Sequence, residues 1–137
     1  FVSSVLTTAG ALGGRGKIDL GVGFLEMGLY EACYALFSAA AVEEELREES
    51  TLLMAQADFH ARRLSRAELA IGDLLSRETQ PKGPVALDAR YWMARILEEW
   101  GRGDEATLWY GEVIKQDVTH RDSLDRLRLL RSRGEAP

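Results

Sequence analysis

The side chains that most often carry covalent or metal chemistry are sparse in this sequence. It has one cysteine, Cys33, and two histidines, His60 and His120. A cysteine nucleophile needs a base within hydrogen-bonding reach, and a zinc site needs His and Cys ligands at short spacings. Neither histidine lies beside Cys33, and no H-E-x-x-H, C-x-x-C or glycine-rich phosphate loop is present. We therefore predict a protein that is not an enzyme and needs no metal or cofactor.

Acidic residues are plentiful, but their spacing is typical of structure. Five glutamates fall within residues 43–49, at a junction between two predicted helices, where they favour the dipole of the second helix. The ligand spacing and central glycine of an EF-hand calcium loop are missing. A solvated face fits this run better than a metal site.

Composition and charge narrow the class of protein. The 137 residues suit one domain, with 46% hydrophobic and 28% charged residues. The net charge of −5 disfavours nucleic acid as a partner, although residues 120–133 hold five arginines against two aspartates. No apolar run approaches the roughly 20 residues of a membrane span, and the mildly apolar residues 1–12 lack the basic flank of a signal peptide. A lone cysteine favours a reducing compartment, so we expect a cytoplasmic protein.

An internal repeat organises the chain. Leu20-Gly21 matches Met54-Ala55 at an offset of 34 residues, and Met93-Ala94 follows at a further offset of 39. The five extra residues fall in the turn-forming segment 80–84, which reads as a lengthened loop.

Each copy has the periodicity of two helices. We predict helical pairs at 17–27 and 31–41, at 47–60 and 64–76, and at 85–100 and 104–116, followed by a capping helix at 121–133. Residues 1–16 read as a linker or an extra helix, and the fold class is all-α. Trp92 and Trp109 fall off the core stripe and are expected to be partly exposed, whereas Trp100 is expected to pack at the turn of the third pair.

The spacing of these residues resembles the tetratricopeptide repeat family. Leu20-Gly21-x-x-Phe24, then Gly28, then Cys33-x-x-x-Phe37 and Ala40 are similar to its pattern of small and aromatic residues, and Ala94, Gly101, Ala106 and Tyr110 keep that pattern in the third copy. Two departures are that no copy ends in proline and that Asp58 stands where the other copies have Phe24 and Leu97. The resemblance implies a right-handed superhelix of three repeats, at about 17–46, 47–84 and 85–118, within a domain of residues 17–137.

The resemblance also implies where a partner would bind. In that family the first helices of successive repeats line a concave groove, which here corresponds to ten residues: Ile18, Val22, Leu25, Leu52, Gln56, Phe59, His60, Tyr91, Arg95 and Glu98. Most of these residues in the first and second copies are apolar. We therefore expect an amphipathic helix or apolar peptide of another protein as the ligand. Phrases such as residues 23–30 look like repeats of bacterial scaffold proteins for cell polarity or pilus assembly.

A second interpretation comes from a different class. The chain would then be a structural, regulatory or oligomerisation segment of a larger protein, with the groove filled by its own residues 1–12 or by a second copy. Whether the groove is occupied, and by what, separates the two interpretations.

Overall fold

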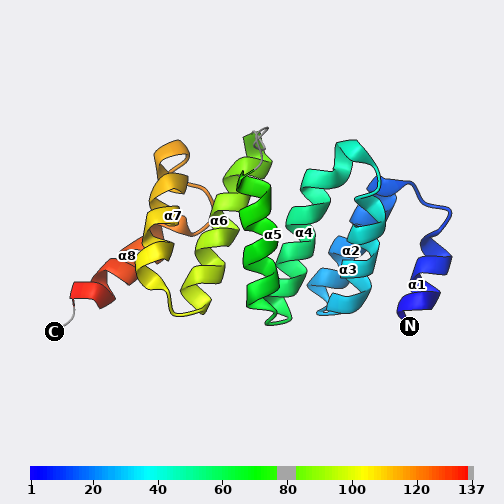
Figure 1. Cartoon of the computed structure of the whole chain (residues 1–137), viewed down its shortest axis with the longest axis horizontal. Coiled ribbons are helices and arrows are strands. Elements are labelled where there is room, and N and C mark those ends of the chain that lie inside the picture. Colours follow the sequence, from blue (N-terminus) through cyan, green and yellow to red (C-terminus); the bar gives the residue numbers. More distant parts are fainter. Residues whose placement is uncertain (77–82, 136–137) are drawn as a thin grey trace. The chain divides into compact units, whose positions relative to one another are not determined.

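The structure is a computed structural model that describes residues 1–76 and 83–135, and these residues form eight α-helices, one 3-10 turn and no strand (Figure 1). The helices are α1 (Val2–Ala9), α2 (Gly14–Glu26), α3 (Tyr30–Ala40), α4 (Arg47–His60), α5 (Leu64–Ser76), α6 (Gly83–Glu99), α7 (Gly103–Gln116) and α8 (Ser123–Glu135), with η1 at Glu44–Leu46. The all-α prediction is confirmed for the described residues. The chain divides into two compact units, Phe1–Leu74 and Leu75–Pro137.

The helix boundaries agree closely with the pattern in the sequence. The bounds of α4 and α5 are those predicted, and α1 is the extra helix that was left open for residues 1–16. The prediction for α8 is wrong at its start, because Arg121 has φ of 50° and lies outside the helical region. Of the loop predicted at 80–84, residues 80–82 lie outside the described residues. Gly83 and Pro84 begin α6, where proline is tolerated because its N–H has no helical partner.

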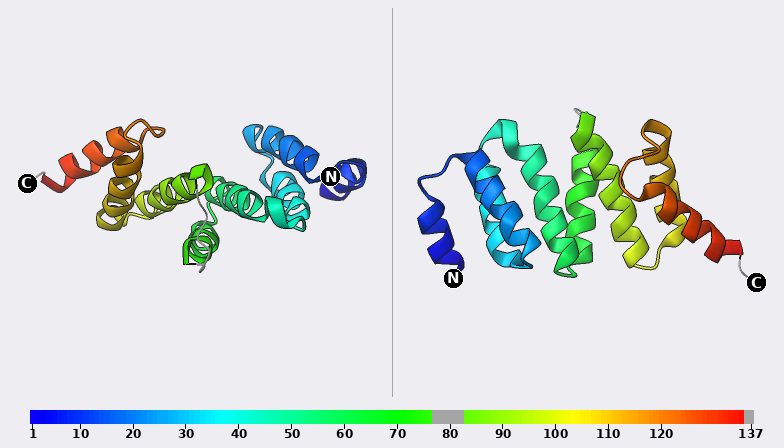
Figure 2. Two further views of the ribbon diagram at one scale, coloured as in Figure 1. Left: turned by 90° about the horizontal axis from the view of Figure 1, so that it is seen from above. Right: turned by 180° about the vertical axis from the view of Figure 1, so that it is seen from behind.

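In the first unit, α3 is the helix on which the others pack. It contacts α1, α2 and α4, and Figure 2 shows α1 beside the α2–α3 hairpin. Its buried residues Cys33 and Phe37 form a cluster with Ile18, Ala40 and Ala57. On the other side, Leu36 packs with Val5 and Ala9 of α1. Of the apolar residues of 1–12, Val5 and Ala9 therefore pack against α3, whereas Phe1, Leu6 and Leu12 are exposed.

Close approach of α2 to α3 depends on a glycine. A Cβ atom on Gly21 would lie 2.6 Å from Cε1 of Phe37, whose ring is fully buried. No carbon can be accommodated at that distance, so the ring occupies the space that a side chain at residue 21 would need. This confirms the small-residue contact expected between the paired helices.

The three first helices of the predicted copies end in the same way. The second residue after each helix has positive φ, 78° at Gly28, 67° at Arg62 and 79° at Gly101. In each case the next N–H bonds back five residues, from Leu29 to Phe24, from Arg63 to Asp58 and from Arg102 to Leu97, at 2.9, 2.8 and 2.8 Å. This is the Schellman arrangement that closes a helix C-terminus. It recurs at the offsets of 34 and 39 residues found in the sequence.

The second unit is built around α7, which contacts both α6 and α8. Leu97, Tyr110, Val113 and Leu127 are fully or almost fully buried there. Only Ser123 and Leu127 of the described α8 side chains are buried, so α8 has a narrow apolar contact, as expected of a terminal cap. Among the described residues, no helix has the length and apolarity to cross a membrane.

The Gly21 contact predicts a sharp difference between two glycines of α2. Gly21→Ala should lower the free energy of unfolding by about 1–3 kcal/mol, because the new methyl group overlaps the Phe37 ring. Gly23→Ala is the matched control, since nothing lies within 4 Å of its Cβ position. It should stabilise the helix by about 0.5–1 kcal/mol. Urea unfolding of both variants measures the difference, and equal effects would contradict this register.

The helix ends predict a second pair of opposite effects. Gly101→Ala should cost about 1 kcal/mol, because alanine must adopt the left-handed conformation at φ of 79° although it has space there. Gly111→Ala, within α7 and equally free of neighbours, should add up to about 1 kcal/mol. Thermal melting of both variants checks the signs. A stabilising Gly101→Ala would mean that this turn does not hold its positive φ.

Candidate protein-binding surface

In the first unit the predicted binding residues divide into buried and open ones. Ile18, Leu52 and Phe59 are only 2%, 4% and 4% exposed. Their predicted role as groove contacts is wrong in this structure, because they have almost no surface to offer. Ile18 belongs to the core cluster around Cys33 and Phe37. The inward position of a first helix therefore also serves the packing of its own unit.

Phe59 is buried beside an unusual neighbour. Asp58 stands at the position of Phe24 and Leu97 in the other copies and is itself 3% exposed. Its carboxylate accepts a hydrogen bond of 2.8 Å from Nε of Arg63 and lies 3.6 Å from Nε of Arg66. A buried carboxylate persists only when it is paired in this way. The second copy thus replaces an apolar contact by an ionic one, while keeping its neighbour Phe59 inside.

Four of the predicted residues in the first unit keep accessible surface. Val22 and Leu25 of α2 are half-buried against the core cluster, Gln56 of α4 is half-buried, and His60 is exposed. We call these four residues the open stripe. The helices that carry it are tied together by a bidentate ion pair, in which the Arg15 guanidinium donates to Glu49 at 3.0 and 2.7 Å.

Apolar surface extends beyond the open stripe at the end of α2. Met27 and Leu29 are 63% and 38% exposed. The ring of His60 stacks on Tyr30, with centroids 6.1 Å apart and planes at 17°. Tyr30 and Leu29 in turn line a pocket of about 550 Å³ that also includes Phe1 and Val2. This edge of the first unit combines apolar and aromatic side chains with a histidine.

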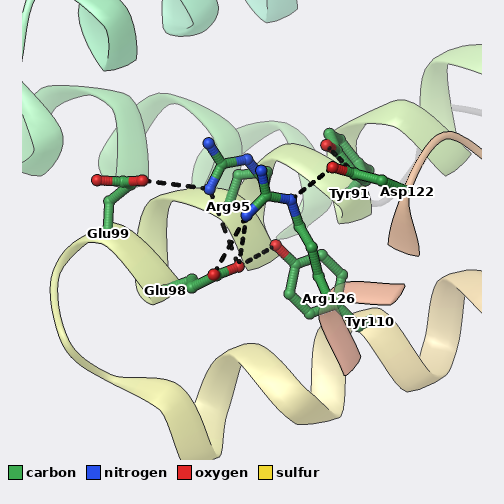
Figure 3. Close-up of polar contacts among 7 residues, drawn as sticks. All are labelled: Tyr91, Arg95, Glu98, Glu99, Tyr110, Asp122 and Arg126. Atoms are coloured by element: carbon green, nitrogen blue, oxygen red, sulfur yellow. Dashed lines mark hydrogen bonds and ion pairs between the residues drawn. The ribbon is translucent and has the colours of Figure 1, made fainter. Parts of the chain in front are cut away.

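In the second unit, polar contacts join Tyr91 and Glu98 of α6 to Arg126 of α8 and to Asp122, the residue before α8 (Figure 3). Tyr91 is 5% exposed, and its hydroxyl donates to Oδ1 of Asp122 at 2.6 Å. Nε of Arg126 donates to the other oxygen of the same carboxylate at 2.7 Å. Asp122 and Arg126, four residues apart, therefore act as one unit that holds α8 to α6. The predicted role of Tyr91 as an open groove contact is wrong for this reason.

Glu98 links all three helices of the second unit. Its Oε1 accepts a hydrogen bond of 2.6 Å from the Tyr110 hydroxyl of α7, and its Oε2 accepts one of 3.2 Å from Arg126 of α8. Arg95 lies on the same face, 3.9 Å from Glu98 and 3.4 Å from Glu99. Arg95 and Glu98 were predicted to face a partner. Here they contact each other, and Glu98 also contacts Arg126 of the cap.

Burial and these contacts change the acidity of the groups involved. Burial and the hydrogen bond to Asp122 raise the pKa of Tyr91 to about 12. Burial and the bond to Glu98 likewise raise the pKa of Tyr110. Although burial acts in the opposite direction, the bonds from Tyr91 and Arg126 leave the pKa of Asp122 below its usual value. Both tyrosines therefore stay neutral donors, and Asp122 stays a charged acceptor, at neutral pH.

The segment between α7 and α8 is held to α6 by a second group of contacts. Nε2 of His120 lies 2.8 Å from the Asp88 carboxylate, and Nε of Arg121 donates to it at 3.0 Å. The Arg121 guanidinium also lies 5.3 and 5.7 Å from the ring centroids of Tyr91 and Trp92. His120 therefore takes part in holding the cap.

The tryptophans correct one further prediction. Trp92 is 7% exposed, so the partial exposure predicted for it is wrong. Trp100 lies at the turn between α6 and α7, where it is 42% exposed and the Arg102 guanidinium lies 5.5 Å from its ring. Trp109 is half-buried, as expected. Cys33 is buried with a raised pKa, caused mainly by burial, which agrees with its interpretation as a small core residue.

Three residues that hold α8 in place were not identified from the sequence: Asp88, Asp122 and Arg126. One signal was available, because Asp88 and Asp122 are 34 residues apart, as are Arg15 and Glu49. These positions are equivalent in successive first helices. An acidic residue recurring at one repeat position beside basic neighbours indicates ion pairing between adjacent copies.

No known protein family, represented by its model, matches this chain, and no curated protein matches it. Within residues 1–76 and 83–135 there is no group of three or more His, Cys, Asp or Glu side chains that could hold a metal ion.

The raised pKa of Tyr91 predicts how the cap responds to alkali. The folded state favours the neutral phenol, so its stabilising contribution is complete below the ordinary pKa of 10.0 and is lost as the pH rises through about 12. Tyr91→Phe should cost about 1–3 kcal/mol at neutral pH, because it removes a hydrogen bond to a carboxylate. Subtracting the ultraviolet pH titration of this variant from that of the native chain should isolate a phenol with a midpoint near 12. A midpoint at the ordinary value would show that the Asp122 contact is absent.

Proposed function

We propose that this chain is a protein-binding scaffold, in which the open stripe and the apolar edge beside it receive an amphipathic helix or apolar peptide of another protein. The resemblance to tetratricopeptide repeats suggests this mode of binding, and bacterial scaffolds for cell polarity or pilus assembly are the setting to which that resemblance points. The compartment we propose is the cytoplasm.

The observation that carries the proposal is the contrast between equivalent positions. Arg95 and Glu98 of α6 contact side chains of the chain itself, and Arg126 of α8 reaches Glu98. Val22 and Leu25, their counterparts in the first copy, are apolar and keep accessible surface. Exposed apolar side chains that gather on one surface are typical of interaction sites. Their partial burial also limits the entropy lost when a partner orders them.

The chemistry of the surroundings favours a ligand with some positive charge. Asp19 and Glu26 are exposed on α2, the helix that carries Val22 and Leu25. The first unit as a whole has six Lys and Arg residues against eleven Asp and Glu. A helix with an apolar face and basic flanks would complement both the stripe and its edges.

A closed structural segment is the second candidate, and one observation favours it. The cap α8 already covers the inward residues of α6 through the chain's own side chains. Filling of the groove by residues 1–12 has no such support. Helix α1, which lies in that segment, packs against α3 and Phe24, and the open stripe on α2 and α4 stays accessible.

A pair of leucine variants tests the binding proposal. Leu25→Ser should reduce recovery of the partner by at least about tenfold, because anchoring apolar residues dominate most interfaces. Leu69→Ser on α5 is the matched control, since Leu69 is 74% exposed and lies outside the stripe. Affinity purification from the source organism, quantified against the native chain, gives the readout. Phe59 is unsuitable as a test residue because it is buried.

Two results would contradict the proposal. If Leu25→Ser keeps every partner that the native chain recovers, binding does not use the open stripe. If it melts as low as Phe37→Ser, which removes a fully buried ring, Leu25 is a core residue and the surface is misplaced.

A further inference from the structure

The exposed side of α8 carries charged side chains that have no oppositely charged partner among the residues that the structure describes. Arg128, Arg131 and Arg133 are exposed, and Leu129 between them is 54% exposed. Within residues 1–76 and 83–134, none of these three guanidiniums has an acidic partner. Arginines elsewhere are mostly paired, as shown by Arg15 with Glu49, Arg63 and Arg66 with Asp58, Arg102 with Glu105, and Arg121 with Asp88. Exposed arginines without an acidic partner among the described residues are thus concentrated on α8. Arg128 and Arg131 lie on one side of this helix, whereas Arg133 lies on the opposite side and lines a pocket with Asp104 and Glu105.

A surface of opposite character lies in the first unit, between α3 and α4. Glu43, Glu44 and Glu45 are exposed and have no basic partner in the described part of the chain, and the adjacent Val42 is 78% exposed. Arg47, the nearest basic residue in sequence, donates instead to the carbonyl oxygens of Ala41 and Val42, at 3.1 and 3.3 Å. It shapes the segment without neutralising it. We call residues 42–45 the acidic segment.

We propose that the outer face of α8 binds the acidic segment of a second copy of this chain. Each surface has an exposed apolar residue among unpaired charges of one sign, and the two signs are opposite. Arg128 and Arg131 are three residues apart on α8, so they lie on neighbouring turns of one side. Leu129, the residue after Arg128, would meet Val42 at one edge of this contact and lose contact with water.

Charge also argues against an anionic polymer or membrane as the occupant. The net charge is −5, and the first unit alone has five more acidic than basic residues, so the chain as a whole is repelled by an anionic surface. Asp125 interrupts the basic face as well. A local acidic segment that also offers an apolar residue avoids both penalties.

The contact joins two different surfaces, so it does not close on itself as a symmetric dimer does. Each copy keeps one free α8 face and one free acidic segment, which means that association continues with concentration into short linear chains. Because the charges are exposed, salt should weaken the contact strongly.

Sedimentation equilibrium of the native chain and two neutralised variants tests this proposal. At low salt the native mass should rise with concentration, and 0.5 M salt should lower the association constant at least about tenfold. Arg128→Gln with Arg131→Gln, and Glu43→Gln with Glu44→Gln and Glu45→Gln, should each be monomeric. An equimolar mixture of the two should form a one-to-one dimer and nothing larger, because each contributes the single surface that the other lacks.

A variant with the same loss of charge elsewhere is the control. Arg102→Gln with Lys115→Gln removes two basic residues, one just before α7 and one within it, that each pair with a glutamate of α7. This variant should associate like the native chain. The proposal is wrong if the native mass is independent of concentration, as it would be if the two surfaces paired within one molecule. It is also wrong if the mixture stays monomeric, or if the α8 arginines bind anionic vesicles while the chain remains monomeric.

Discussion

The contact between Gly21 and the ring of Phe37 sets the geometry on which the first unit depends. A Cβ atom at residue 21 would lie 2.6 Å from that ring, so α2 and α3 can approach closely only because the side chain is absent. With Phe37 fully buried between them, α3 offers one side to α2 and α4 and another to α1. The position of the open stripe on α2 follows from this contact, since Val22 is the next residue along the helix.

Residues at equivalent positions in successive copies differ in whether they have partners within the chain, and the difference arises from their charge and polarity. In the second unit Tyr91, Arg95 and Glu98 lie among carboxylates and guanidiniums. Asp122, just before α8, contacts Tyr91, and Arg126 of α8 contacts Glu98. Polar groups so buried must be paired, and α8 supplies the partners from within the chain. The corresponding residues of α2 are apolar and need no such partner, so partial exposure is tolerable there. One repeated scaffold can thus end in a closed face in one unit and keep an accessible one in the other.

Most of the helical framework could be predicted from the sequence, because its determinants are local. The bounds of α4 and α5, the turns at Gly28 and Gly101, and the small residue at position 21 all follow from spacing and residue type. The burial of Leu52 and Phe59 could not be predicted, because residues on the inward side of a first helix can also pack in the core of their own unit. The partners of Tyr91 and Arg126 were also missed. They lie about 30 residues away, and nothing local distinguishes a carboxylate that will accept from one that stays in water.

Photo-crosslinking from two equivalent positions tests the contrast between the copies most directly. A photoreactive amino acid would replace Gln56 of α4 in one variant and Arg95 of α6 in another, 39 residues apart and both half-buried. The account predicts adducts with a helical segment of another protein from position 56, and adducts only with this chain, around Arg126, from position 95. Partner adducts from position 95 alone, or adducts from position 56 only with the chain's own residues, would contradict it.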